Sequence, residues 1–462
     1  MNISAADSLA DVVGKANVLT DPFDLDRYTG DALSPTRAFG AEAAFERLAD
    51  VVVRPKSTAE VVKILQMANE LRLPVVPYGG GTGVMGGTVP VQGGIVLDMQ
   101  RMNRVLAVDP VGLTAEVEAG AVLGNVESLL AEHGLMLGHD PYSVPIATIA
   151  GTISTNGVGY RASAYGPMGE QVVGLEAVLP TGQVITTRAV PKYSSGPNMN
   201  HLFIGSEGSF GVITKATIKV FRLPESQIFS AMAFDSFDQG FNATVEMLAL
   251  GIKPALLDLT EEEDGILLHL LFEGFKEGVK AQEKRSMRVG TQAGGRPQGP
   301  EPTIAYWEVR RDSAENYKNS ALGKPRSVRW SRWGSRQGFD YLHLALPTSR
   351  VLEYRRQADR IMAAEGIKSV EYAIWSRPEL FSMLIVPESG NQADARDRLA
   401  RTVDRVLKLA QDMGGTMEYC HGVGVKLNHL LAREMGASHE VVRTLKKTLD
   451  PNNIMNPGKL GL

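Results

Sequence analysis

The first regular pattern along the chain is a helical one, framed by two short apolar runs. Apolar residues recur every three or four positions, at Val61, Ile64, Leu65, Ala68 and Leu71. This spacing predicts a helix with one buried face, and the preceding Ser57-Thr58-Ala59-Glu60 has the sequence of a capping box. The apolar runs at 51–53 and 73–77 predict strands on either side of the helix.

Further along, the pattern changes to the period of a strand. The alternating set comprises Val212, Thr214, Ala216, Ile218 and Val220, and it predicts a strand with one buried face. Pro180-Thr181-Gly182 predicts a turn between two other strands. Towards the C-terminus, helices expected at 241–250 and 351–365 and a strand expected at 339–347 predict an antiparallel sheet covered by helices.

A glycine-rich loop follows the apolar run at 73–77. The segment PVVPYGGGTGVMGG contains a literal G-x-G-x-x-G at Gly81, Gly83 and Gly86. A Rossmann loop must open a helix that receives the pyrophosphate, whereas here glycine and proline recur and a strand is expected already at 95–99. No Lys-Ser or Lys-Thr pair follows, which excludes a P-loop. The loop fits either a phosphate-binding backbone concavity or a glycine-rich surface turn.

Composition excludes several classes of function. A chain of 462 residues with 44% hydrophobic and 22% charged residues is expected to form two or three globular domains. The net charge of -4 and the scattered Lys and Arg argue against nucleic acid as a partner. Cys420 is the single cysteine, so neither an intrachain disulfide nor a cysteine-based metal cluster is expected. Because the sequence shows no signal peptide and no run of about 20 apolar residues, we expect a cytoplasmic protein without a membrane span.

Three later segments indicate what the glycine loop accompanies. GHDPYSVPIATIAGTISTNG at 138–157 is rich in small residues, which suits close approach of the backbone to an extended ligand. LFIGSEGSFGVITKATIKVF occupies 202–221, and LDPNNIMNPGKLG occupies 449–461. In this order, the segments resemble the FAD-binding domain of the vanillyl-alcohol oxidase/p-cresol methylhydroxylase superfamily, in particular its glycolate oxidase and D-lactate dehydrogenase branch. The resemblance runs over 21–222 and resumes in the C-terminal segment.

The resemblance implies an α+β fold with a two-part FAD-binding domain of p-cresol methylhydroxylase type. It places this domain at 1–224, an antiparallel-sheet cap (substrate) domain at 225–414, and at 415–462 a segment that returns to the FAD domain. The implied cofactor contacts are Gly79, Gly80, Gly81, Thr82, Gly83, Val84, Thr148, Gly151, Thr155, Glu207, Gly208, Ile213 and Asn456. Relatives with covalent FAD commonly attach it through a histidine in the glycine loop, but the first histidine here is His133. Non-covalent FAD is therefore expected.

The segment GGTMEYCHGVGVKL at 414–427 occupies the place where relatives carry a histidine next to the flavin. The resemblance assigns this position to His421. Imidazole has a pKa near neutrality and can remove the hydroxyl proton during alcohol oxidation. The alternative is a neutral histidine hydrogen-bonded within a turn. Tyr419 and Glu418 are weaker catalytic candidates. Strand alternation would place Tyr419 on the same face as His421 and Glu418 on the opposite face.

The chain departs from the 2-hydroxy-acid dehydrogenases of the family at the metal site. These relatives carry a histidine pair in the cap and a glutamate directly before the C-terminal histidine. Here no histidine lies between His343 and His421, and Cys420 replaces the glutamate. Trp375 and Phe381 stand near the positions of the metal ligands. We therefore expect no metal, and Cys420 is interpreted as a packing residue.

Two basic segments of the cap carry possible substrate contacts. Arg310, in YWEVRRDSAEN, matches the carboxylate-binding arginine of the same relatives. A guanidinium suits a carboxylate or phosphate, and the alternative is a salt bridge to Glu308 or another acid. The segment at 316–338 contains Trp330 and Trp333, interpreted either as substrate contacts or as part of a solvated loop.

Together, these features predict an FAD-dependent dehydrogenase or oxidase that oxidises an alcohol or 2-hydroxy acid by hydride transfer to flavin N5. Its expected partners are a small-molecule substrate and an electron acceptor, which is oxygen, a quinone or an electron-transfer protein. If Arg310 binds the substrate, the substrate is a carboxylic acid. Three alternatives stay open. They are a phenolic-compound oxidase of the superfamily, an enzyme resembling alkyl-dihydroxyacetone-phosphate synthase, whose HHHGVG element CHGVG partly matches, and a non-enzymatic flavoprotein. The substrate and the oligomeric state are also open, although a homodimer is common among relatives.

Overall fold

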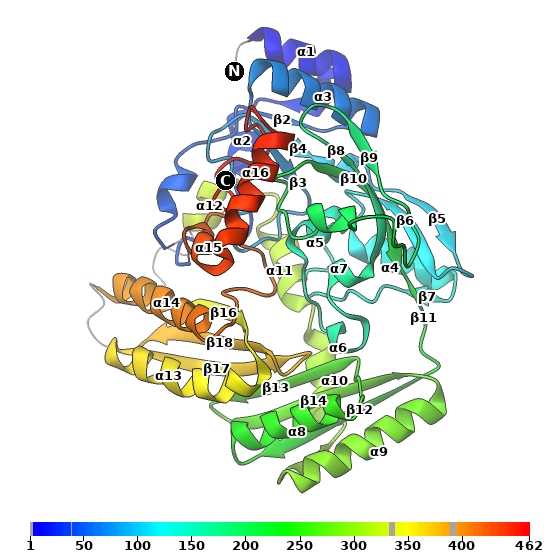
Figure 1. Cartoon of the computed structure of the whole chain (residues 1–462), viewed down its shortest axis with the longest axis vertical. Coiled ribbons are helices and arrows are strands. Elements are labelled where there is room, and N and C mark those ends of the chain that lie inside the picture. Colours follow the sequence, from blue (N-terminus) through cyan, green and yellow to red (C-terminus); the bar gives the residue numbers. More distant parts are fainter. Residues whose placement is uncertain (1–2, 38, 332–337, 389–393) are drawn as a thin grey trace.

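The computed structural model describes residues 3–37, 39–331, 338–388 and 394–462. Two lobes lie one above the other in Figure 1, and the N-terminal and C-terminal segments both belong to the upper lobe. The upper lobe contains two main sheets, whereas the lower lobe is built around a single large sheet.

The glycine loop leaves the last strand of the first sheet of the upper lobe. Its strands run in the order β1 (Val18–Leu19), β2 (Val51–Val53), β4 (Ile95–Asp98) and β3 (Val75–Tyr78), and β4 is parallel to both of its neighbours. Helix α3 (Thr58–Leu71) connects β2 to β3 and buries Val61, Ile64, Leu65 and Ala68 of the predicted face, whereas Leu71 in its last turn is exposed. Residues 79–94 are all described and none is helical, which confirms that the glycine loop is not a Rossmann loop.

Ser57 caps α3, but the predicted capping box is only half formed. Its Oγ accepts a hydrogen bond from the N–H of Glu60 (3.3 Å). The Glu60 carboxylate accepts from the N–H of Lys56 (2.7 Å) rather than from that of Ser57. The second bond is thus displaced by one residue, and it still ties the entering chain to the first helical turn.

The second sheet of the upper lobe contains the strand predicted from alternation. Five antiparallel strands run in the order β5 (Val105–Asp109), β6 (Thr114–Glu118), β10 (Val212–Lys219), β8 (Val172–Val178) and β9 (Val184–Thr186). The predicted strand is β10, which pairs on both sides. Helices α4 (Leu123–Glu132) and α5 (Ile149–Thr155) pack on this sheet through Leu123 and Ile149, among other residues.

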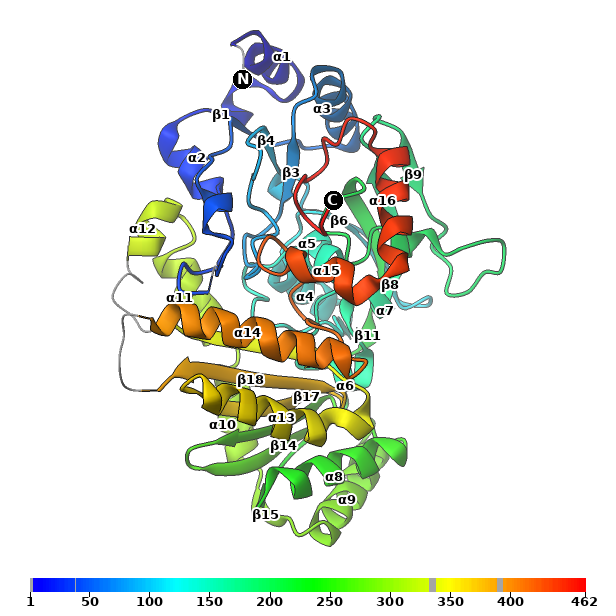
Figure 2. The same ribbon diagram turned by 60° about the vertical axis from the view of Figure 1, so that its left-hand side comes forward.

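The lower lobe is the antiparallel sheet covered by helices that the sequence predicts. Its strands run in the order β15 (Arg296–Gly299), β12 (Ser226–Phe234), β14 (Gly265–Gly274), β13 (Leu256–Glu262), β17 (Ile367–Trp375), β18 (Leu380–Pro387) and β16 (Asp340–Ala345). Helices α8 (Phe237–Ala249), α9 (Lys276–Gln292), α13 (Val351–Ala364) and α14 (Ala395–Asp412) share its hydrophobic core. Figure 2 shows α13 and α14 beside β17 and β18.

The two faces of this cap sheet differ in character. Leu259 of β13 belongs to the core beneath the helices, whereas Asp258 and Thr260 line a cavity shared with the upper lobe. Successive side chains of a strand point to opposite faces. One face therefore holds the cap together, and the other is available for a site.

The C-terminal segment returns to the upper lobe. Helices α15 (Asn428–Met435) and α16 (Ala437–Leu449) lead into a final stretch that runs beside β3 (Figure 1). There the N–H of Val75 donates to the Ile454 carbonyl (2.7 Å), and the N–H of Asn456 donates to the Val75 carbonyl (2.8 Å). The chain end thus extends the sheet from which the glycine loop leaves.

The described part of the basic segment, residues 316–331, is helical over much of its length and is not the solvated loop of one interpretation. It contains the end of helix α11 (Asp312–Ser320) and helix α12 (Arg326–Ser331). Trp330 packs on Phe45, with ring centres 4.7 Å apart, and its Nε1 donates to the Leu33 carbonyl (3.2 Å). Trp333 lies outside the described residues.

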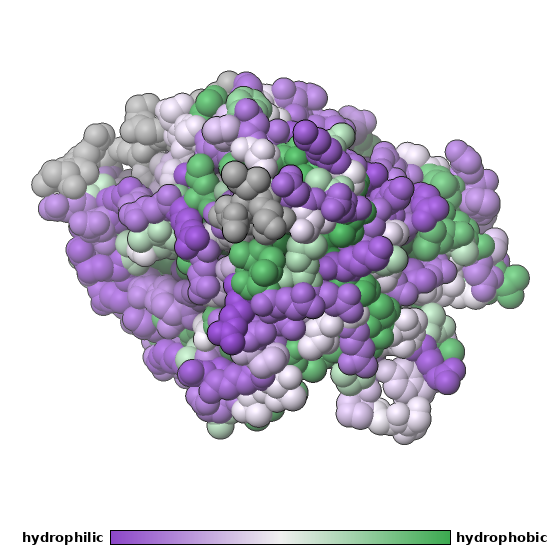
Figure 3. All heavy atoms as spheres, turned by 90° about the horizontal axis from the view of Figure 1, so that it is seen from above, coloured by the Kyte–Doolittle hydropathy of each residue, from purple (hydrophilic) through white to green (hydrophobic). Residues whose placement is uncertain are grey.

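The molecular surface mixes polar and apolar residues. Figure 3 shows hydrophilic and hydrophobic residues interspersed over the upper face. Within the described ranges, no helix has both the length and the apolar character that a membrane span requires.

Candidate active site

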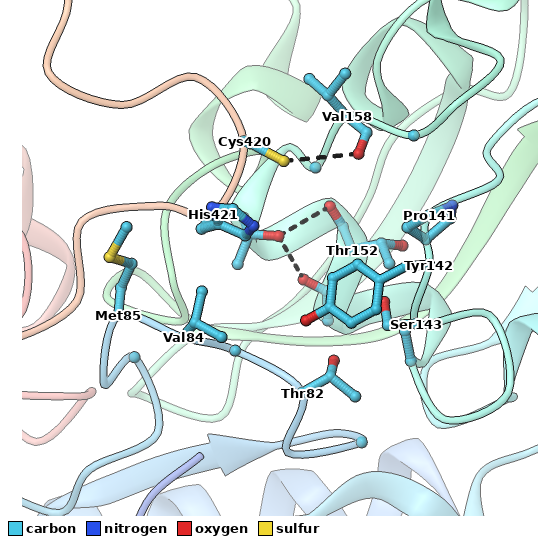
Figure 4. Close-up of a pocket in the computed structure, with 18 of the residues that line it drawn as sticks. Thr82, Val84, Met85, Pro141, Tyr142, Ser143, Thr152, Val158, Cys420 and His421 are labelled. Atoms are coloured by element: carbon cyan, nitrogen blue, oxygen red, sulfur yellow. Dashed lines mark hydrogen bonds between the residues drawn. The ribbon is translucent and has the colours of Figure 1, made fainter. Parts of the chain in front are cut away.

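A cavity of about 560 Å³ lies between the two lobes. Its walls include the loop at 77–85, the stretch at 139–160, residues 207–213, the cap strands β13, β16 and β17, and the turn at 420–424. Asp31, Arg37 and Tyr306 also line it. Figure 4 shows Thr82 and Val84 of the glycine loop on one side of this space and Cys420 and His421 on the other. The cavity therefore joins the glycine loop to the candidate catalytic histidine.

The glycine loop presents backbone N–H groups to the cavity. A Cβ on Gly83 would lie 2.8 Å from Asp31 Oδ2, and a Cβ on Gly80 would clash with the Ile146 carbonyl oxygen. The N–H groups of Gly86 and Gly87 donate to the Asp31 carboxylate (2.9 and 3.1 Å). Those of residues 79–84 donate to no acceptor within the described part of the chain. N–H groups gathered in this way suit the oxygens of a phosphate.

The facing wall carries buried polar atoms without protein partners. Thr148 Oγ1 and both ring nitrogens of His139 are buried at the cavity and form no hydrogen bond with any described residue. Burial lowers the pKa of His139 to about 4, so its ring is neutral at pH 7. Buried polar atoms in proteins nearly always have a partner. These atoms, together with the glycine loop, fit a ligand that is both polar and phosphorylated.

The expected cofactor residues gather at this cavity, and Asn456 stands apart from the rest. Gly79 to Val84, Thr148, Gly151, Thr155, Glu207, Gly208 and Ile213 all line it. Asn456 lies behind the wall, where its Nδ2 donates to the carbonyl oxygens of Gly87 (2.9 Å) and Glu207 (2.6 Å). Its observed role is to tie the C-terminal segment to two loops of the cavity wall.

Glu207 supports the backbone next to His421. Its φ of 50° is in the left-handed region, which non-glycine residues rarely adopt. Its carboxylate accepts hydrogen bonds from the N–H groups of Val423 and Gly424, the latter at 2.9 Å. Burial raises the pKa of Glu207 to about 7, although these donors oppose the shift. The side chain thus holds the candidate catalytic turn against the upper lobe.

The segment at 414–427 does not form the expected strand. It runs through turns and bends, with a single bridge between Thr416 and Ala345, so strand alternation does not place Tyr419 or His421. Gly424 has a φ of 53°, and a Cβ there would clash with the Met85 carbonyl oxygen. The glycine thus lets the turn approach the glycine loop.

His421 lies on the cavity wall beside Glu418 and Cys420. Its Nδ1 is 3.5 Å from Glu418 Oε1, an ion-pair distance. The same oxygen accepts hydrogen bonds from the N–H groups of Cys420 (2.7 Å) and His421 (3.0 Å). Burial opposes a charge on the imidazole, but attraction to Cys420 and Glu418 outweighs it and raises the pKa of His421 to about 10. The imidazole is therefore charged at neutral pH.

His343 is a cavity residue that the sequence interpretation missed. Its ring centre lies 4.6 Å from that of His421, and its Nδ1 is hydrogen-bonded to Ser382 Oγ (2.9 Å). Burial, together with the positive charge of His421, lowers the pKa of His343 well below its usual value. Its place in the predicted strand, two positions after Tyr341, was a usable signal, because both residues face the cavity.

Tyr419 is not on the cavity wall. Its hydroxyl is hydrogen-bonded to Ser382 Oγ (2.8 Å), and its ring centre lies 5.6 Å from that of His343. Tyr419 therefore contacts the site through His343 and Ser382, which does not support a direct catalytic role.

Arg310, the expected substrate clamp, is held in a buried ion pair and is not among the residues that line the cavity. Its Nε lies 3.2 Å from Asp140 Oδ2, and its Nη1 donates to the Trp307 carbonyl (2.8 Å). Its guanidinium also stacks 3.8 Å above the centre of the Trp307 ring. The alternative interpretation, a salt bridge, describes this arginine, with Asp140 in place of Glu308.

The cap side of the cavity combines acids with aromatic rings, a cluster that the sequence did not reveal. Asp258 accepts hydrogen bonds from the hydroxyls of Tyr306 and Thr260, the latter at 2.8 Å, and the Tyr341 hydroxyl donates to Glu371. Burial raises the pKa of Asp258 to about 7, although the two hydroxyl donors oppose the shift. Three strands of the cap and helix α10 (Glu301–Val309), which carries Tyr306, supply these residues, so no local pattern joins them.

Trp375 and Phe381, the two aromatic residues near the metal positions of the relatives, lie in different surroundings. Trp375 lines the cavity, and Phe381 is buried in the cap core. Within the described residues, no group of three or more His, Cys, Asp and Glu side chains is arranged to hold a metal ion.

Comparison with known proteins agrees with this architecture. Residues 49–188 match the family described as FAD binding domain, and residues 259–460 match the family described as FAD linked oxidases, C-terminal domain. The D-lactate dehydrogenase of Archaeoglobus fulgidus is 30% identical, over 94% of this chain and 95% of its own. The glycolate oxidase subunit GlcD of Bacillus subtilis is 28% identical, over 92% and 91%.

Solved structures share the fold at lower identity. An alkyldihydroxyacetonephosphate synthase superposes with a TM-score of 0.77 at 21% identity, covering 99% of this chain and 85% of its own. A p-cresol methylhydroxylase superposes with a TM-score of 0.76 at 18% identity, covering 99% and 96%. These findings confirm the expected α+β architecture and FAD as the cofactor that the cavity fits. The chain belongs to the family of FAD-linked oxidases, and it is an FAD-dependent oxidoreductase.

Proposed function

We propose that this enzyme oxidises the carbinol carbon of a 2-hydroxy acid or a related alcohol, with His421 accepting the hydroxyl proton. One observation carries the proposal: the imidazole of His421 lies on the wall of the same cavity as the glycine loop. Two relatives support the substrate class by their names, since glycolate and D-lactate are both 2-hydroxy acids.

The chain's own residues bind the cofactor and move the proton in this proposal. When bound, FAD supplies the ring system that accepts the hydride. The N–H groups of Gly79 to Val84 hold the pyrophosphate, and Thr148 and His139 offer their unpartnered atoms to the rest of the cofactor. His421 takes the hydroxyl proton as the carbinol C–H bond breaks, which leaves a carbonyl product. Glu418 orients the turn through two N–H groups and stabilises the resulting imidazolium.

Anaerobic loss of the flavin absorbance tests the proposal. The purified protein is mixed with D- and L-2-hydroxy acids, para-substituted phenols and polyols, each with and without EDTA. We expect a 2-hydroxy acid to bleach the flavin and EDTA to leave the rate unchanged. Bleaching that EDTA abolishes would contradict the metal-free mechanism, and bleaching by phenols alone would favour the phenolic oxidase.

Variants of two histidines identify the proton acceptor. His421→Asn is expected to retain bound flavin and to slow the bleaching by about 10²- to 10⁴-fold, the usual range for loss of a general base. His429→Asn is the matched control, because His429 is half exposed and pairs with Asp404 at 2.9 Å. It is expected to react at the wild-type rate. Equal rates for both variants would remove His421 from the chemistry.

We also propose that FAD is held without a covalent bond, since the glycine loop contains no histidine. Acid precipitation is then expected to leave all of the flavin in the supernatant. Mixing the reduced protein with oxygen, a quinone or an electron-transfer protein identifies the acceptor by the rate at which the yellow colour returns.

A further inference from the structure

A second arginine, Arg37, reaches the cavity that Arg310 does not line. It lies on the cavity wall, as do Tyr341 and His343 of β16. Its Nε donates to Asp340 Oδ1 (2.8 Å), and its Nη2 donates to the Tyr341 carbonyl (3.1 Å). These two bonds hold the plane of the guanidinium against the start of β16. For Nη1, no hydrogen-bond acceptor is found among the described residues.

The buried charges around Arg37 do not balance. Asp340 is fully buried, and both of its oxygens also accept from Lys426 Nζ (2.7 and 2.6 Å). One carboxylate therefore serves two cations, and a net positive charge stays at this part of the wall. Of these two cations, Arg37 lines the cavity, whereas Lys426 lies behind it. A buried charge without an equal partner is costly, and a bound anion removes that cost.

The neighbouring groups leave this positive charge in place. His343 is neutral, and His421 adds a second positive charge at neutral pH. Glu418 is the acid of the catalytic turn, and it is taken up by His421 and two N–H groups. The cap acids Asp258 and Glu371 each accept a tyrosine hydroxyl.

We propose that Arg37 forms an anion subsite that binds the carboxylate of the substrate. The proposal rests on the proposed oxidation of a 2-hydroxy acid and assigns its second functional group. A carboxylate fits the open side of the guanidinium through charge-assisted N–H···O bonds. Held there, the acid presents its carbinol carbon to the part of the cavity that His421 lines.

Oxalate is the probe, because it carries carboxylates but has no carbinol hydrogen to lose. Its binding is followed by the change in the flavin absorbance spectrum of the oxidised holoenzyme, so the readout does not depend on turnover. Inorganic phosphate is titrated in parallel, to separate a carboxylate site from a phosphate site.

Three variants separate contact from net charge. Arg37→Gln removes the guanidinium but leaves Asp340 paired with Lys426, and Lys426→Met leaves Asp340 paired with Arg37. Neither variant strands a buried carboxylate. Arg37→Lys keeps the charge and loses the planar fork. Flavin content and the oxidised spectrum report whether each variant is folded.

We expect Arg37→Gln to raise the Kd for oxalate by about 10- to 100-fold, the range for loss of a charge-assisted hydrogen bond. Arg37→Lys is expected to fall between Arg37→Gln and the wild type. Lys426→Met is expected to raise the Kd for oxalate less than Arg37→Gln does, because it removes one of the buried positive charges but no contact with the anion. An equal loss in Arg37→Gln and Lys426→Met would overturn the contact. Tighter binding of phosphate than of oxalate would overturn the carboxylate assignment.

The two proposals fail in distinguishable ways. If oxalate binds through Arg37 but no 2-hydroxy acid bleaches the flavin, the anion subsite stands and the proposed oxidation is wrong. If a 2-hydroxy acid bleaches the flavin equally fast in wild type and Arg37→Gln, with the same KM, the oxidation stands and the subsite is wrong.

Discussion

The imidazole of His421 accepts a proton only when it is neutral, and its neighbours keep it charged at pH 7. Because attraction to Cys420 and Glu418 raises the pKa of His421 to about 10 against the effect of burial, the active form is the minor one at neutral pH. We therefore expect kcat/KM to rise with pH, by about tenfold per unit below that pKa. Steady-state rates with an artificial electron acceptor measure the profile, and a flat profile below pH 9 would argue against His421.

Cys420, directly before His421 in the chain, contributes to the raised pKa of His421. Its sulfur donates to the Val158 carbonyl oxygen (3.7 Å) at the cavity, and its electrostatic interaction with His421 favours the imidazolium. Cys420→Ser is expected to lower the pKa of His421 and so to move the rise of kcat/KM with pH to lower pH, by roughly one unit or more. If kcat/KM rises at the same pH in a variant with normal flavin content, the raised pKa of His421 is due to Glu418.

The sequence predicted the type of side chain that the site needs, but not which residue supplies it or what that residue contacts. An arginine that binds a carboxylate was expected in the cap, and Arg310 has the right chemistry and the wrong surroundings, because Asp140 and Trp307 engage it. Arg37 carries no local signal that separates it from other arginines. Only the contact with β16, some 300 positions later in the chain, places it on the cavity wall.

At the scale of elements, the cap of α3 gives a test that is independent of catalysis. Ser57→Ala removes the oxygen that accepts from the N–H of Glu60 (3.3 Å), and it is expected to lower the free energy of unfolding by about 1 kcal/mol. Ser128→Ala is the control within a helix, since Ser128 Oγ donates to the Gly124 carbonyl (2.9 Å) inside α4. Chemical denaturation followed by circular dichroism is expected to show little change for that variant.

Elements with a clear period were predicted within a few residues, and those without one were not. The helix expected at 351–365 is α13 (Val351–Ala364), and the strand expected at 339–347 is β16 (Asp340–Ala345). In contrast, the strand implied around His421 does not exist, because four glycines and long-range bonds to Glu207 and Met85 hold the segment in turns. A periodic sequence pattern arises when an element buries one face, and this segment forms no regular element with a buried face.

At the scale of the whole molecule, Asp140 links the two lobes. It lies on the upper-lobe stretch that lines the cavity and pairs with Arg161 (2.5 Å), with Arg310 (3.2 Å) and with Arg311 (2.5 Å). Although burial alone would raise the pKa of Asp140, the three guanidinium groups keep it below its usual value. Arg310 and Arg311 follow helix α10 (Glu301–Val309) of the cap, so the cluster joins lobe to lobe.

Asp140→Asn is expected to destabilise the protein by about 3 to 5 kcal/mol. It takes the acidic partner from Arg310 and leaves Arg161 and Arg311 paired with Glu273 and Glu127 alone. Thermal unfolding followed by flavin fluorescence measures the loss. Glu127→Gln is the control, since the Glu127 side chain that pairs with Arg311 is 29% exposed and its removal is expected to cost less than about 1 kcal/mol. Similar losses in both variants would contradict a special role of the buried carboxylate.

The sequence by itself determined the features that local physics controls. Apolar spacing is set by the repeat of a helix or strand, and a glycine loop without a following helix excludes a Rossmann site whatever surrounds it. Ordered motifs then indicated the family, the FAD and the two-part architecture. The tertiary structure alone decided which side chains meet: His343 beside His421, Asp258 and Glu371 in the cap wall, and Arg37 rather than Arg310 at the cavity. The partner of a charged or polar side chain depends on the packing of distant segments, and no spacing along the chain encodes that contact.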